Sequence, residues 1–206
     1  MSDEFSIRMD SDNGIAPPIE ALQPRPDEKG PKTVAILLIL GGILLAIIGY
    51  GDITLSLADD LAQEEIDLAL TQPRSGGENI TDAEYQQFHD DARDSGAYAI
   101  RGASMWIGGI FIFVGGVLLF RLNSFGSKLA GGGAGLSFIG GVTGSWLIKS
   151  ASTNLPSPTL QLANEIMVYL CGTCTLLCCA LAILPLFNAA SRAALEQNLS
   201  LIIEEE

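Results

Sequence analysis

Four long stretches of this chain contain no Asp, Glu, Lys, Arg or His, and each is largely apolar. They have between 18 and 22 residues and cover residues 33–50, 102–120, 129–148 and 166–187. A helix rises about 1.5 Å per residue, so about 20 residues cross a hydrocarbon core that is about 30 Å thick. The sequence therefore predicts an all-α, polytopic membrane protein built as a four-transmembrane-helix bundle.

The charged residues lie outside these four stretches. The chain has 206 residues and a formal net charge of −13. With four crossings there is room for one membrane domain, residues 33–187, and one modest extramembrane element. The 11 Lys and Arg residues are scattered, which argues against nucleic acid as a partner, because phosphate binding needs clustered cations.

Both ends of the chain are predicted to be polar tails. Residues 1–32 contain five prolines and few apolar residues, a composition that favours a disordered tail. In residues 188–206, Leu195, Leu199 and Ile202 recur at helical spacing, which predicts an amphipathic segment.

Two markers predict the orientation in a cell membrane. Five basic residues flank the predicted spans on the side of the two tails, and three flank them on the other side, which favours cytoplasmic tails. The five are Lys29, Lys32, Arg121, Lys128 and Arg192, and the three are Arg93, Arg101 and Lys149. Aromatic residues, which prefer the headgroup level of a lipid bilayer, gather at the outer ends as Tyr50, Tyr98, Trp106, Trp146 and Tyr169.

The long outer loop is predicted to form an amphipathic helical hairpin over residues 52–99. Apolar residues recur at helical spacing over 53–69, which predicts the first arm. A break rich in Pro and Gly follows over 71–79. Thr81 and Glu84 then have the spacing of a capping box, which predicts the start of the second arm.

Two features of this loop could carry a modification or a ligand. A glycosylation sequon begins at Asn79 and can be used only if the loop is exported; another begins at Asn198 in the predicted inner tail. His89, Asp90 and Asp94 combine an imidazole with carboxylates, which can bind a divalent cation. They lack a defined ligand spacing, so a solvated acidic face is the favoured interpretation, and no cofactor is expected.

Glycine is the second prominent feature of the predicted spans. Because glycine has no side chain, helix backbones can approach closely and gain van der Waals contact. Gly108 and Gly115, like Gly109 and Gly116, lie seven residues apart and are predicted to share a seam. Small residues cover most of the third stretch, which is therefore predicted to be the central, most tightly surrounded helix. The predicted packing residues are Gly41, Gly42, Gly108, Gly109, Gly115, Gly116, Gly131, Gly135, Gly140, Gly141 and Gly144.

The fourth stretch contains the motif Cys171-Gly-Thr-Cys174. Such a pair can cycle between dithiol and disulfide when one thiol has a lowered pKa. With four predicted spans, a long outer loop after the first and this motif near the outer end of the fourth, the chain resembles the vitamin K epoxide reductase family. The resemblance implies a thiol oxidoreductase, but residues 51–101 contain no counterpart of the family's second cysteine pair.

No Asp, Glu, Lys, Arg or His lies within the predicted spans, which argues against a proton-coupled transporter or a channel with charged rings. Cysteine suits the same close packing as glycine, so packing is the favoured role of Cys171 and Cys174. The predicted function is that of a non-catalytic accessory or scaffolding subunit that binds a membrane protein or a second copy of itself. The alternative is a membrane thiol-disulfide oxidoreductase that uses Cys171 and Cys174.

Overall fold

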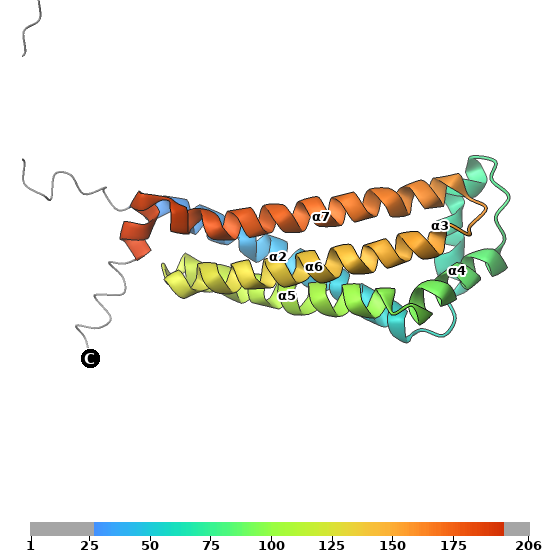
Figure 1. The fold of residues 1–206 in the computed structure, drawn as a ribbon, viewed down its shortest axis with the longest axis horizontal. Coiled ribbons are helices and arrows are strands. Elements are labelled where there is room, and N and C mark those ends of the chain that lie inside the picture. The colour runs from blue at the N-terminus through green and yellow to red at the C-terminus, as the bar shows by residue number, and fades with distance from the viewer. Residues whose placement is uncertain (1–26, 196–206) are drawn as a thin grey trace, which may run out of the picture.

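The computed structural model describes residues 27–195, which contain helices and no strand. Four long helices run side by side, and two short helices cover one end of them (Figure 1). The long helices are α2 (Lys29–Leu57), α5 (Ala97–Phe120), α6 (Ser124–Ser152) and α7 (Pro158–Phe187). The short ones are α3 (Gln63–Ser75) and α4 (Asp82–Asp94), and we call residues 58–96, which contain them, the cap.

Three of the long helices, α2, α5 and α7, are long and apolar enough to cross a membrane. α6 has 29 residues, the same length as α2. Its many glycines and serines make it less hydrophobic, so length and composition single out three helices rather than the predicted four.

α5 is the most closely packed of the four long helices, so the prediction that the third stretch, in α6, would be the most tightly surrounded is wrong. α6 also has a long helix on each side, α5 and α7. α5 lies between α2 and α6 and packs against both along most of its length, whereas α7 packs mainly on α6. α2 and α7 make a small contact. The reason is that α5 offers small residues to two neighbours, whereas part of the glycine surface of α6, at Gly132 and Gly135, meets no other side chain or helix within 4 Å.

The predicted first arm of the hairpin, residues 53–69, is divided in the structure. α2 continues through Leu57, the chain is not helical over residues 58–62, and α3 begins at Gln63. Side chains of α4 bind the backbone of this break: Arg93 Nη1 donates to the carbonyl of Ala58 at 3.0 Å and to that of Asp59 at 2.7 Å. These hydrogen bonds satisfy backbone carbonyls that have no helical partner at the break.

α3 then continues through Pro73 to Ser75, so the break before α4 is shorter than the predicted 71–79. α4 begins with the predicted capping box at Thr81. The Glu84 amide donates to the Thr81 hydroxyl at 3.2 Å, and the Thr81 amide donates to the Glu84 carboxylate at 2.8 Å. Buried side chains of the cap, α5 and the α6–α7 connection form a small core of their own, which includes Leu70, Ile80, Phe88, Ala92, Tyr98 and Leu155.

The two ends of the described chain meet at the opposite end of the molecule. The Asp27 amide donates to the carbonyl of Ala190 at 3.1 Å, and residues 189–195 form a further helical segment whose Leu195 joins the core of the long helices. α2 begins at Lys29, so the last residues of the predicted disordered tail are helical. The rest of that tail and the distal part of the predicted amphipathic tail, with Leu199 and Ile202, lie outside the described residues.

Candidate functional site

Two rows of glycine run along α5, one toward each neighbouring helix. Gly102, Gly109 and Gly116 face α2. Gly108 and Gly115 face α6. Within each row the glycines are seven residues apart and so recur on one face every two turns. The pairs Gly108/Gly115 and Gly109/Gly116 therefore serve two different neighbours.

At these rows the helices touch backbone to backbone. A Cβ at Gly109 would lie 2.7 Å from the backbone nitrogen of Ala46, and one at Gly108 would lie 2.6 Å from the carbonyl oxygen of Gly133. Real Cβ atoms essentially never approach so closely, so only glycine permits this spacing. Such contact between backbones is what stabilises helix association in lipid.

The remaining predicted packing glycines lie in different settings. Those at which a Cβ would come within 3.0 Å of an atom of another helix are Gly42, Gly140, Gly141 and Gly144. Those with looser or no such contact are Gly41, Gly131 and Gly135. Three further packing glycines were not predicted from the sequence: Gly49, Gly126 and Gly133, where a Cβ would also meet backbone atoms. The spacing of seven residues that links Gly49 to Gly42, and Gly126 to Gly133, could have revealed them.

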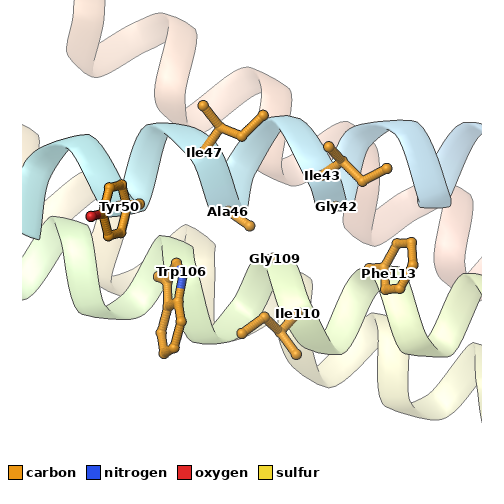
Figure 2. Close-up of a pocket in the computed structure, with 9 residues that line it drawn as sticks. All are labelled: Gly42, Ile43, Ala46, Ile47, Tyr50, Trp106, Gly109, Ile110 and Phe113. Atoms are coloured by element: carbon orange, nitrogen blue, oxygen red, sulfur yellow. The ribbon is translucent and has the colours of Figure 1, made fainter.

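An open apolar groove of about 370 Å³ follows the contact between α2 and α5 (Figure 2). Three small residues, Gly42, Ala46 and Gly109, lie among larger side chains. Tyr50 and Trp106 lie toward one end of the groove. The remaining lining residues are Ile43, Ile47, Ile110 and Phe113. The large residues are exposed, Ile47 to 64%, so this face is open to lipid or to another helix.

A buried ion pair joins α2 to α5 where the long helices meet the cap. Arg101 Nε donates to Asp52 Oδ2 at 2.7 Å, and Arg101 Nη2 donates to Asp52 Oδ1 at 2.6 Å. The Arg101 and Asp52 side chains are 15% and 6% exposed, so each charge depends on the other. Neighbouring glycines make room for the pair: a Cβ at Gly144 would lie 2.5 Å from Arg101 Cβ.

From the sequence, Asp52 and Arg101 were expected in the outer loop, and no contact between them was predicted. Because α2 continues through Leu57 and α5 begins at Ala97, both residues lie inside long helices. Their positions in the sequence could have suggested the pair. Each residue lies within two residues of an uncharged stretch, and both lie on the same predicted side of the membrane.

The structure does not bring the predicted metal candidates together. His89 is buried, and its Nε2 lies 3.4 Å from the carbonyl oxygen of Ala58. Asp90 and Asp94 instead lie 3.5 and 3.4 Å from Arg93. Within residues 27–195, no three His, Cys, Asp or Glu side chains are grouped so that they could hold a metal. His89 thus helps to dock α4 on the end of α2.

The cysteines of α7 are free thiols. Cys171 is buried against α6, where a Cβ at Gly141 would lie 2.8 Å from its sulfur. Cys174 is exposed. The two thiols of the Cys-x-x-Cys motif therefore occupy different surroundings, one in the α6–α7 contact and one on the open face of α7.

Glu78 joins the cap to the start of α7. One carboxylate oxygen accepts a hydrogen bond from the Ser157 hydroxyl. The other accepts from the amide of Thr159 at 3.2 Å and from its hydroxyl at 2.5 Å. The side-chain bonds from Ser157 and then Thr159 lower the pKa of Glu78, because they favour the charged carboxylate. The N-terminus of α7 also favours a negative charge at this place.

No family model, no curated protein and no solved structure matches this chain. The resemblance to the vitamin K epoxide reductase family therefore rests on the order of the predicted spans and on one short motif.

Proposed function

We propose that this protein is a non-catalytic membrane protein, an accessory or scaffolding subunit that binds a helix of another membrane protein in the α2–α5 groove. The observation that supports this proposal is the open apolar groove between α2 and α5. Gly42 and Gly109 hold α2 and α5 backbone to backbone at the floor of the groove. The large side chains above them, such as Ile47 and Trp106, are exposed and can pack against the side chains of a foreign helix. A binding surface of this kind needs no charge and no reactive group.

The reactive groups of the described residues support a structural role. Asp52 and Arg101 satisfy each other, and His89 is buried within the cap. Cys171 fills a gap beside Gly141, as a small packing residue does. Each of these groups has a role in holding helices together.

The proposal includes four membrane crossings, with α6 as the fourth. α6 has an uncharged stretch at residues 129–148 and follows α5 along its length through the Gly108 and Gly115 row. Tyr50, Trp106 and Trp146 are exposed in the cap-proximal halves of their helices, on the side where the proposal places the outer interface. We place the cap outside the cell membrane and both tails in the cytoplasm.

The groove is tested by photo-crosslinking in native membranes. A photoreactive residue in place of Ile47, which is 64% exposed in the groove, should yield one specific adduct that mass spectrometry can identify. The matched control replaces Leu177, 57% exposed on α7, and should not yield that adduct. A product with the mass of a dimer would identify a second copy as the occupant. Identical adducts from both positions would contradict the proposal.

The orientation is tested separately by cysteine labelling. In a variant without native cysteines, Ser75→Cys in the cap should react with an impermeant maleimide added to intact cells. Ser11→Cys in the N-terminal tail should react only after the membrane is permeabilised. The reverse pattern would move the cap to the cytoplasm.

A further inference from the structure

We infer that Asn79, between α3 and α4, carries an N-linked oligosaccharide. The residue begins the sequon Asn79-Ile80-Thr81, and its side chain is exposed. The inference rests on the proposed orientation, because the enzymes that attach such sugars act on exported segments. It adds a covalent modification to the cap that the scaffolding role does not require.

The backbone presents the two recognition residues of the sequon on the same side. Residues 78–81 form an irregular segment outside the helices, and Thr81 has an extended backbone. In an extended chain successive side chains point to opposite faces. Glu78 is bound to α7 and Ile80 is 4% exposed, whereas Asn79 and Thr81 are both exposed. The acceptor amide and the hydroxyl two residues later therefore face solvent together.

The segment is anchored on both sides of Asn79, so a sugar would displace no buried group. Before it, Glu78 is held by Ser157 and Thr159. After it, the carbonyl of Ile80 accepts from Arg74 Nε at 3.3 Å and from Arg74 Nη2 at 3.1 Å. An attached oligosaccharide would project away from the cap and leave these contacts in place.

The reaction needs a lipid-linked oligosaccharide as donor. A bond forms between Asn79 Nδ2 and the anomeric carbon of the sugar, and the bond from that carbon to the carrier's phosphate oxygen breaks. The phosphate leaves with the bonding electrons, and the amide nitrogen releases one proton to a base. No group is oxidised or reduced.

The capping box engages the sequon hydroxyl in the folded cap, although the Thr81 side chain is exposed. In the folded cap the Thr81 hydroxyl donates to the Glu84 carboxylate at 2.8 Å and accepts from the Glu84 amide at 3.2 Å. A transferase that reads this hydroxyl finds it free of these two bonds only before the first turn of α4 closes. Modification is therefore expected during membrane insertion rather than on the folded protein.

The test is peptide mass spectrometry on the full-length protein purified from its native membranes. Trypsin cuts after Arg74 and Arg93, and the peptide 75–93 between them contains no other Lys or Arg. We expect this peptide to carry a sugar mass that fragmentation assigns to Asn79. Asn79→Gln should abolish the modification and increase the gel mobility of the whole protein, whereas Asn198→Gln should change neither.

The labelling of Ser75→Cys separates the failure of this inference from a failure of the orientation. An unmodified peptide 75–93 in a protein whose Ser75→Cys variant reacts from outside would overturn the glycosylation alone. An unmodified peptide together with labelling only after permeabilisation would overturn both. A sugar on Asn198 with none on Asn79 would also overturn both.

Discussion

The long helices and the cap are held together by different means. At the Gly109 and Gly108 rows, α5 touches α2 and α6 through backbone atoms. In the cap, long polar side chains reach the backbone of another segment, as Arg93 does at Ala58 and Asp59. Lipid provides little hydrophobic drive between helices, so close packing has to stabilise them. In water a single polar contact contributes little, so the cap combines several with the small apolar core that includes Leu70 and Phe88.

The junction of the two regions should be the most sensitive place. Arg101→Met would leave the Asp52 carboxylate buried and unpaired. Breaking a buried pair on one side costs about 3–5 kcal/mol, which should appear as a large loss of unfolding free energy in detergent. The double variant Asp52→Leu/Arg101→Met is the control and should recover much of that loss. A single variant as stable as the native protein would show that the pair does not hold the junction.

The next largest effect should come from the glycine rows. Gly109→Val would push a side chain into the backbone of α2 at Ala46, and overpacking of this kind costs about 1–3 kcal/mol. Gly135→Val on α6 is the matched control, because a Cβ there meets nothing within 4 Å beyond its own helix. Thermal unfolding in detergent should separate the two variants. Equal losses of stability in the two variants would mean that an effect within each helix, rather than close packing between helices, destabilises both.

A smaller, pH-dependent effect is expected in the cap. The pKa of Glu78 is lowered by the bonds from Ser157 and Thr159, so the carboxylate stabilises the folded state above its ordinary pKa of 4.5. That contribution is lost as the pH falls through the lowered folded-state pKa. Glu78→Gln should remove this pH dependence and speed hydrogen exchange at the Thr159 amide. The exposed Glu64→Gln on α3 is the control and should leave exchange at Thr159 unchanged.

The cysteines should show the smallest effect. Cys171→Ala and Cys174→Ala should both retain the assembled fold, with Cys171→Ala the more costly because it opens space beside Gly141. Alkylation with a large maleimide before and after reduction should give the same gel pattern. A reducible Cys171–Cys174 disulfide in freshly isolated membranes would contradict the scaffolding role and favour the oxidoreductase alternative.

Patterns that are local along the chain could be interpreted from the sequence. Uncharged apolar stretches indicated the long helices, because a run of about 20 such residues is typical of a helix that can cross a hydrocarbon layer. The start of α4 could be predicted because Thr81 and Glu84 bond to each other within one turn. The end of α2 could not be predicted, because the break at residues 58–62 is stabilised by hydrogen bonds from Arg93, which lies on α4, much later in the sequence.

Which helix is the most closely packed was decided only in three dimensions. A glycine pattern does not indicate which helix packs against it. The sequence therefore showed small residues on α5 and α6, but not that α5 places one glycine row against α2 and another against α6. The Asp52–Arg101 and Glu78–Ser157 contacts depend in the same way on helix ends that lie far apart in the chain. Periodicity and hydropathy are properties of one segment, whereas the rotation of packed helices follows from all their contacts together.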